Sequence, residues 1–340
     1  MARSKKSDDA VVSPPSSIRE EIRFSSGCYP LDLVLGGGYV VGRVIDIYGE
    51  SATGKTYLAA QAVSEFFKAV ESPVCLYVDT EQTFSTDFAS KVGCPPQSDT
   101  MIVRNDITSL QELYSVLLEV KESFLEKGHN VLVVVDSLDA LVDQAEADAG
   151  ATLSGFAVGK PKFLSAKLFP LITMMIGKFG QHLTFYIVSQ ARSSLNPYGP
   201  KEVRSGGRAL KFYCSQILHI SKQDIKKTVL SRQVPIGLNI KVVVEKNKCG
   251  SFGQSVVVPV YFNSGISNNQ ACALFLSDFG KKERAKEFME EWKGAVSEKA
   301  ATEIFDRISN RLRAEVAERW AQFERVIAER NAGDLSDTEI

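Results

Sequence analysis

The sequence has no long hydrophobic run, no closely paired cysteines and almost no net charge. No stretch approaches the ~18 apolar residues that a membrane-spanning helix needs. The six cysteines are scattered without a C-x-x-C pair, which favours reduced, mostly buried thiols over a disulfide framework. The 40 Lys and Arg residues balance 41 Asp and Glu residues, so any nucleic-acid binding must come from a local basic patch. We therefore expect a cytoplasmic protein with no membrane partner.

The composition that remains is that of an ordinary globular protein. Apolar residues make up 44% of the 340 residues and charged residues 24%, which is enough for one large domain with appendages or for two domains. Residues 1–17 are basic, polar and proline-containing, and they lack the apolar stretch of a signal peptide. We expect residues 1–23 to form a flexible leader.

Strand and helix patterns alternate along the first two thirds of the chain. They predict strands at 40–48, 74–78, 131–135 and 183–188 and helices at 53–70, 110–125 and 163–179. The run at 131–135 is wholly apolar, as in a strand buried on both faces. This order predicts an α/β fold with a mostly parallel, twisted sheet that is flanked by helices.

The character of the chain changes after about residue 213. Strands are predicted at 214–220, 238–245 and 255–262 without intervening helices, which indicates an antiparallel or mixed extension of the sheet. A helical region follows at 278–331, with an apolar stripe that favours packing on its own domain over a subunit contact. We therefore predict a core domain at 24–270 and a helical C-terminal region with an acidic tail at 271–340.

One motif carries the strongest functional signal. The segment 49–56 matches G-x-x-x-x-G-K-[ST], and it follows a predicted strand and opens a predicted helix. Backbone N–H groups of such a loop and the helix N-terminus cradle phosphates, while the lysine reaches the β- and γ-phosphates and the Thr hydroxyl ligates Mg²⁺. The motif predicts an ATP and Mg²⁺ site made by Gly49, Glu50, Ser51, Ala52, Thr53, Gly54, Lys55 and Thr56.

Three polar side chains follow strands that end at the same edge of the predicted sheet. Asp136 closes a buried strand, where it would hold the Mg²⁺ shell through water. Glu81 follows the second strand and is the candidate to activate the attacking water, with Asp79 as a competing carboxylate. Gln190 ends a further strand, where its amide would bond the γ-phosphate or merely cap the strand.

From about Phe24 to Ile266 these residues resemble the RecA recombinase family, of the bacterial or phage strand-exchange type that includes the UvsX type. Two segments discriminate this family from other phosphate-loop ATPases: Gly206–Tyr213 resembles the end of its second DNA-binding loop, and Glu245–Lys248 resembles its lysine pair. The other matching segments, in the family's order, are Ser25–Asp32 with Leu35–Gly38, the phosphate loop, Asp79–Glu81, Val135–Ser137 and Ser189–Gln190.

The resemblance implies further roles around the nucleotide. Glu81 would activate water, and Gln190 would sense the γ-phosphate and couple it to a DNA loop. Lys246 and Lys248 would reach ATP bound on an adjacent subunit, so that ATP lies at a filament interface. Phe212 would lie on that interface, and Phe88 would lie near the adenine.

Two long segments are the candidate DNA-binding loops, at 143–162 and 191–207. The second is longer than most connections, and such loops are usually functional or disordered. Its basic residues would contact phosphates, and Leu195 or Tyr198 would stack or wedge between bases. The DNA-binding candidates are Lys160, Lys162, Arg192, Leu195, Lys201, Arg204, Gly206, Gly207 and Arg208.

Three hypotheses for function remain open. The first is a DNA-dependent ATPase that binds single-stranded DNA, forms a filament or ring-like oligomer, and promotes pairing and strand exchange with homologous duplex DNA. The second is a recombination mediator or paralogue without strand exchange, which would form small fixed oligomers. The third is a signalling ATPase of the KaiC type, which would not need Arg204 or Arg208. The first implies a bacterial cell or a phage-infected host as its location, and a single-strand-binding protein or mediator as a further partner.

Overall fold

The computed structural model describes residues 21–144, 159–193, 202–204, 207–229, 231–262, 264–297 and 302–332. Within them one ten-stranded sheet has the order β12-β11-β10-β9-β3-β7-β6-β4-β5, with β8 paired to β7. The parallel part consists of β3 (Val44–Gly49), β7 (Leu183–Ser193), β6 (Asn130–Asp136), β4 (Pro73–Asp79) and β5 (Met101–Arg104). The predicted parallel α/β core is confirmed.

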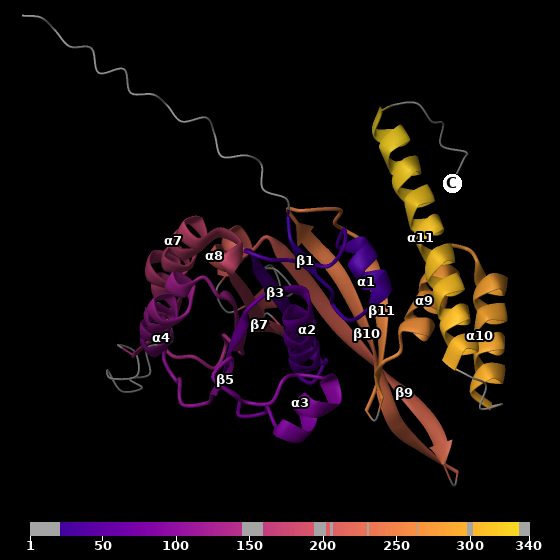
Figure 1. Ribbon diagram of the computed structural model, residues 1–340, viewed down its shortest axis with the longest axis horizontal. Helices are drawn as coiled ribbons and strands as arrows, with labels where there is room; N and C mark the ends of the chain where they lie inside the picture. The colour runs from indigo at the N-terminus through magenta and orange to yellow at the C-terminus, as the bar shows by residue number, and fades with distance from the viewer. Residues whose placement is uncertain are drawn as a thin grey trace, which may run out of the picture.

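The predicted antiparallel extension is also confirmed. β9 (Gln216–Val229) runs parallel to β3 and antiparallel to β10 (Arg232–Asn247), and β11 (Ser255–Tyr261) and β12 (Gly265–Ile266) complete that side of the sheet. β9 and β10 are much longer than predicted, and Figure 1 shows their far ends projecting from the body as a two-stranded arm. β8 (Glu202–Arg204) returns antiparallel along the end of β7.

Helices cover both faces of the sheet, and a buried apolar cluster lies under each layer. One layer contains α2 (Lys55–Ala69) and α3 (Thr86–Val92). The other contains α4 (Leu110–Ser123), α6 (Gly159–Phe163), the π-helical turn Leu164–Leu168, α7 (Phe169–Phe179) and α8 (Gly207–Tyr213) (Figure 1). Short 3₁₀ turns lie at Leu125–Lys127 and Gly180–His182.

α4 illustrates why these residues form helices at these places. Ser109 caps its start, with the Ser109 hydroxyl accepting from the Glu112 N–H at 3.2 Å and the Glu112 carboxylate accepting from the Ser109 N–H at 3.0 Å. This reciprocal capping satisfies two backbone donors that a helix start otherwise leaves unpaired. Leu113, Leu117 and Val120 then face the core at helical spacing.

Among the described residues, the stretch Lys160–His182 is the one helix that is long enough and apolar enough to cross a membrane. Its apolar face packs inside the protein, because Leu164, Leu168, Phe169, Ile172 and Met175 are buried against the sheet. Core helices of this kind meet the same length and composition criteria, so the stretch is weak evidence for a membrane span.

An opening segment closes one side of the core. β1 (Arg23–Phe24) and β2 (Tyr39–Val40) pair antiparallel around α1 (Tyr29–Val34). The Asp32 carboxylate accepts hydrogen bonds from both hydroxyls of Ser25 and Ser26, and its backbone carbonyl accepts from the N–H groups of Gly37 and Gly38. These hydrogen bonds of Asp32 to the two serines and the two glycines thus fold the opening segment onto itself.

The C-terminal region differs from the single helical stretch expected at 278–331. It contains α9 (Asn268–Asp278), α10 (Lys282–Ser297) and α11 (Thr302–Ala332), and the first break contains Gly280 at φ +79°. Ile308, Leu312, Val316 and Trp320 of the predicted stripe are buried in the cluster that also contains α2. The stripe therefore packs on its own chain, as predicted. In Figure 1 these helices lie beside β11, and the far end of α11 projects beyond the body.

Candidate functional site

A cavity of about 280 Å³ opens at the carboxyl edge of the parallel strands. It gathers the phosphate-loop motif with side chains that follow β4, β6 and β7, as the strand order predicts. Leu238 of β10 forms one wall. The residues that line the cavity are Ser51, Ala52, Thr53, Gly54, Lys55, Thr56, Glu81, Asp136, Gln190 and Leu238.

The phosphate loop between β3 and α2 is a backbone cradle. Gly54 is the N-cap of α2 at φ +95°, and a Cβ atom at this position would lie 2.5 Å from Cδ1 of Ile240. Only glycine fits that conformation and that space. No side chain caps α2, and its first turn contains no acidic residue. The N-terminal N–H groups are therefore left for an anion, which fits the phosphates of ATP.

Lys55 lies in the cradle with its charge directed back at the loop. Its ammonium Nζ donates to the carbonyls of Gly49 at 3.1 Å and Glu50 at 2.6 Å. Burial lowers the pKa of Lys55 below its usual value, and the nearby carboxylates of Glu81, Asp136 and Asp139 oppose that shift. A bound phosphate would add a negative charge next to the ammonium, whose direct hydrogen-bond partners are neutral carbonyls.

Asp136 lies at the end of β6, beside the first turn of α2. Its Oδ2 accepts from the Tyr77 hydroxyl at 2.8 Å, and the Thr56 side chain also hydrogen-bonds the carboxylate. Burial raises the pKa of Asp136, and the hydrogen bonds from Thr56 and Tyr77 oppose this effect. A hydroxyl and a carboxylate side by side are oxygen donors that suit Mg²⁺.

Glu81 is the centre of a hydrogen-bonded group on the far wall of the cavity. Its Oε1 accepts from the Ser137 hydroxyl at 2.7 Å and from Nε2 of Gln190 at 3.0 Å. Thr80 fixes the neighbouring backbone, because its hydroxyl both donates to the Ser137 carbonyl and accepts from the Ser137 N–H. Three strand ends are thereby connected at one carboxylate.

Asp79, the competing carboxylate, is engaged elsewhere. Its two oxygens accept from the backbone N–H groups of Thr83 at 3.1 Å and Phe84 at 2.9 Å, and the residue is only 2% exposed. Asp79 therefore holds the turn after β4, and of the two competing carboxylates only Glu81 lines the cavity.

Comparison with known proteins agrees with this geometry. Residues 8–267 match the RecA N-terminal domain family. The chain belongs to the RecA family. It is 34% identical over 256 residues to Protein RecA of Synechococcus sp. (strain CC9605), covering 75% of this chain, and similarly 34% identical over 256 residues to Protein RecA of Rippkaea orientalis. The matched region is 64% of the Synechococcus protein and 68% of the Rippkaea protein, so the chain spans about two thirds of these relatives.

The crystal structure of the RadB recombinase shares the fold. It superposes with a TM-score of 0.50 at 22% sequence identity, covering 71% of this chain and 97% of the RadB chain.

The lysine pair that the RecA resemblance singles out lies away from the cavity. Lys246 of β10 is level with Ile217 of β9 and Asp46 of β3, and the Lys248 N–H donates to the Ser215 carbonyl at 2.9 Å. Gly49 begins the phosphate loop at the other end of β3, about 10 Å from Asp46 at the usual rise of a strand. The two lysines thus lie near the amino ends of β9 and β3, away from Leu238, the residue of β10 that lines the cavity.

Lys246 itself has backbone partners on α8. Its Nζ donates to the Lys211 carbonyl at 2.6 Å and approaches the Phe212 carbonyl at 3.4 Å. Burial lowers the pKa of Lys246, and the nearby charge of Lys248 lowers it further. Phe212 is 73% exposed beside this pair. An exposed aromatic ring next to two lysines is consistent with the predicted subunit contact, which stays a prediction.

The remaining predicted positions have mixed placements. Phe88 of α3 is half-buried against Tyr57 and Phe84, with ring centroids 6.1 and 6.3 Å away. Lys160 donates to the carbonyls of Leu138, Asp139 and Leu141 at 2.6 to 2.8 Å, so its charge holds the turn after β6. Lys162 is exposed.

Three of the nine predicted DNA-binding positions fall outside the described residues, and four more are described in their backbone alone. Leu195, Lys201 and Gly206 are not described, and for Arg192, Arg204, Gly207 and Arg208 the backbone alone is placed. That backbone shows Arg192 and Arg204 on the β7–β8 hairpin, with Arg192 paired to Val203 and Ala191 paired to Arg204. The role of all these residues in DNA binding stays a prediction.

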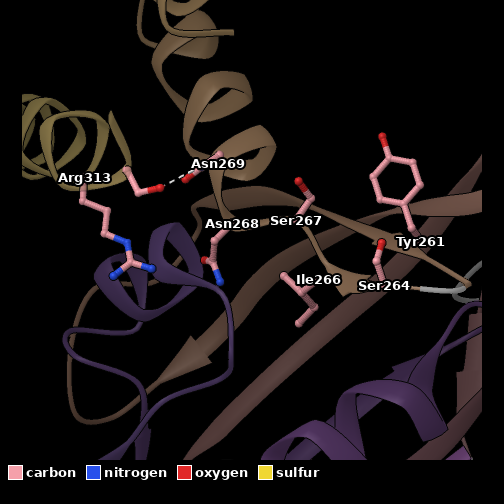
Figure 2. A pocket seen from close by; sticks show the side chains of 8 residues that line it. Tyr261, Ser264, Ile266, Ser267, Asn268, Asn269 and Arg313 are labelled. Atoms are coloured by element: carbon pink, nitrogen blue, oxygen red, sulfur yellow. Dashed lines mark hydrogen bonds between the residues drawn. The ribbon is translucent and has the colours of Figure 1, made fainter. Parts of the chain in front are cut away.

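A second cavity, of about 540 Å³, lies between the end of the sheet and the C-terminal helices. Figure 2 shows Tyr261, Ser264 and Ile266 on one side and Arg313 of α11 on the other. Asn268 is committed to the fold, because it accepts from the Tyr29 N–H at 2.7 Å and donates to the Gly27 carbonyl at 2.9 Å. This wall ties α9 to the opening segment.

Sequence reasoning missed three residues of the first cavity or its support. Ser137 lies in the segment Val135–Ser137 that resembles the family, but its hydrogen bond to Glu81 was not predicted. Leu238 comes from a strand far along the chain, and no local pattern signals that it reaches the phosphate loop. Tyr77 was counted as part of an apolar strand, although a buried tyrosine hydroxyl needs a partner.

Proposed function

We propose that this chain is an ATP-dependent recombinase that binds single-stranded DNA, forms a filament or ring-like oligomer, and promotes pairing and strand exchange with homologous duplex DNA. The observation that carries the proposal is the position of Gln190. Its side chain bonds Glu81 inside the cavity, and the chain continues from it into the β7–β8 hairpin that flanks the predicted DNA loop. A change at the γ-phosphate therefore has a direct covalent route to that loop.

ATP and Mg²⁺ are the proposed cofactors. The cradle 49–56 would hold the phosphates, with Lys55 supplying charge. Thr56 would bind Mg²⁺ directly and Asp136 would bind it through water. The metal would neutralise charge on the phosphates and hold them in place for hydrolysis. Glu81 would orient the attacking water, to which its carboxylate is open on the cavity side.

The site would be completed by a second copy of the chain. Lys246 and Lys248 lie near the amino ends of β9 and β3, and neither lines the cavity of its own chain. A neighbouring subunit stacked on the carboxyl edge would bring its own pair to the nucleotide. Phe212, exposed beside the pair, would enter the same contact, and Phe88 would lie near the adenine.

DNA would bind at the two loops, with the nine positions named in the sequence as candidates. To bind a DNA phosphate, Lys160 would have to break its hydrogen bonds to three backbone carbonyls. Lys162 is exposed without that constraint. A single-strand-binding protein or mediator would be a further partner, and the cytoplasm of a bacterium or phage-infected host the location.

Electron microscopy with single-stranded DNA and a non-hydrolysable ATP analogue tests the proposal. We expect extended filaments with DNA and analogue present, and ATP hydrolysis that single-stranded DNA stimulates. Lys55→Ala should abolish ATP-dependent DNA binding together with hydrolysis. Small oligomers of fixed size, with hydrolysis insensitive to DNA, would instead identify a mediator-type member of the family.

A further inference from the structure

Two tyrosines lie side by side under the phosphate-loop helix, one on each side of β6. Tyr77 of β4 and Tyr186 of β7 both pair with Val134, and both are fully buried in the cluster beneath α2. Asp136 is two residues further along β6, on the same face as Val134. A diagonal neighbour at this spacing is within reach of an aromatic side chain.

The two hydroxyls have different partners. Tyr77 donates to Oδ2 of Asp136 at 2.8 Å, whereas the Tyr186 hydroxyl lies 3.3 Å from the Tyr39 hydroxyl. The Tyr77 ring is fixed by Phe84, whose centroid is 4.4 Å away at an interplanar angle of 41°. Tyr77 therefore hydrogen-bonds the Asp136 carboxylate, whereas the hydroxyl of Tyr186 contacts another tyrosine of the core.

Asp136 is held from two directions. Tyr77 contacts it from the interior of the sheet, and the Thr56 side chain contacts it from the phosphate loop. We propose that Tyr77 is a positioning residue that orients the Asp136 carboxylate toward the Mg²⁺ shell, a role that rests on the proposed ATP and Mg²⁺ site. Without this bond a buried carboxylate can rotate about its terminal torsion, which is broad.

Hydrogen bonds behind a metal-binding carboxylate commonly set its orientation, and their loss typically weakens metal affinity 10- to 100-fold. The water-mediated contact proposed for Asp136 depends on the direction of the carboxylate, which the hydrogen bond from Tyr77 sets. Tyr77→Phe removes one hydroxyl and leaves the ring against Phe84, so the packing is retained.

Tyr186→Phe is the matched control. It removes a hydroxyl of equal burial from the neighbouring strand, but the lost partner is Tyr39 and Asp136 is untouched. Any general effect of losing a buried hydroxyl on folding should be common to both variants. A change restricted to Tyr77→Phe must come through Asp136.

The experiment measures Mn²⁺ binding by the loss of the free-ion electron paramagnetic resonance signal, with a non-hydrolysable ATP analogue present. Analogue binding in excess EDTA is measured in parallel, and thermal unfolding is followed for each variant. We expect Tyr77→Phe to weaken Mn²⁺ binding by about 10-fold, at the lower end of that range. Tyr77→Phe should bind the analogue in EDTA as tightly as the parent chain does. Tyr186→Phe should match the parent chain both in Mn²⁺ binding and in analogue binding.

Three results would overturn the inference. Equal Mn²⁺ affinity in Tyr77→Phe and the parent would show that the hydroxyl does not orient Asp136. Equal losses in Tyr77→Phe and Tyr186→Phe, with equal drops in melting temperature, would show a packing role only. Failure of the parent chain itself to bind the analogue or Mn²⁺ would reject the proposed function, and the inference with it.

Discussion

At the scale of single residues, the cavity holds charged groups that are already partnered within the protein. Glu81 accepts two hydrogen bonds, Asp136 accepts from Tyr77 and Thr56, and Lys55 donates to two carbonyls. Such partners fix each group before a ligand arrives, which reduces the reorganisation that binding and hydrolysis require. We therefore expect that the contribution of Lys55 to nucleotide binding can be measured separately from the contribution of Glu81 to hydrolysis.

Nucleotide binding should take up a proton at alkaline pH. Burial holds the pKa of Lys55 below 10.5 in the free protein, and bound phosphates would favour the charged form and raise that pKa again. Between the pKa of Lys55 in the free chain and its pKa in the complex, the free chain lacks a proton that the complex carries, so affinity should fall as pH rises through the free-protein pKa. Calorimetry in buffers of different ionisation enthalpy measures this uptake.

Lys55→Arg is the control, because a guanidinium stays charged across this range. The variant should bind nucleotide without the alkaline proton uptake, even if its affinity is lower. Proton uptake that persists in Lys55→Arg would assign the titrating group elsewhere.

Glu81→Gln should separate binding from hydrolysis. The amide keeps the size of the side chain and can still accept a hydrogen bond, but it cannot act as a base toward water. We expect the DNA-stimulated turnover to fall by a factor on the order of 10² to 10⁴, with analogue affinity retained. Asp79→Asn, at the carboxylate that holds the turn after β4, should lower stability and leave a smaller effect on turnover. The reverse ranking would assign the base to Asp79.

At the scale of elements, the C-terminal helices depend on an aromatic cluster. Trp320 of α11 packs against Phe275 and Phe279, with centroids 6.0 and 6.2 Å away, and against Phe323 at 5.3 Å. This contact joins α11 to α9, which in turn packs on the core. The helices therefore share one buried cluster with the sheet.

Trp320→Ala should lower the free energy of unfolding by about 3–5 kcal/mol, as for other large-to-small changes in a core. Urea denaturation followed by circular dichroism measures the loss. Met174→Ala, at a position 56% exposed, should change it by less than about 0.5 kcal/mol. A small effect of Trp320→Ala would mean that α11 is only loosely attached to the core.

Elements with one clear period could be predicted, and those shaped by tertiary contacts could not. The apolar run at 131–135 and the amphipathic stretch at 110–125 correspond to β6 and α4, because burial on two faces or on one leaves a recognisable pattern. α9 was missed because Ala271, Cys272, Ala273, Phe275 and Leu276 are all buried, so it has no polar face to mark a period. α3 and β5 are short, and the exposed arm of β9 and β10 has little apolar alternation.

The site shows the same division. Lys55, Thr56, Glu81, Asp136 and Gln190 were found because each ends a strand or lies in a motif, and strand ends converge at one edge. Where a side chain sends its hydrogen bonds is a property of neighbours that are distant in sequence. The hydrogen bonds of Lys160 to three carbonyls and of the Tyr77 hydroxyl to Asp136 could therefore not be predicted from local sequence.

At the scale of the whole molecule, the lysine pair lies apart from the cavity of its own chain, and a mixing experiment tests whether a neighbouring copy uses it. Lys246→Ala combined with Lys248→Ala should abolish hydrolysis but leave analogue binding by the chain's own cradle. Mixing that double variant with Lys55→Ala chains should restore part of the activity, because a Lys55→Ala chain can donate intact lysines to a neighbour's intact cradle. ATPase measured against mixing ratio should peak at intermediate ratios. Absence of restored activity at every ratio would place the lysines outside the site.

The cavity and the lysine pair are also two unlike surfaces of the molecule, separated along β10 between Leu238 and Lys246. Copies stacked through unlike surfaces form an open chain unless the rotation closes a ring. In the proposed assembly each junction would make one complete hydrolysis centre, and one terminal copy would keep a cradle that no neighbour completes. Turnover per chain should therefore climb with oligomer length and level off on long DNA, whereas a closed ring would show no such end deficit.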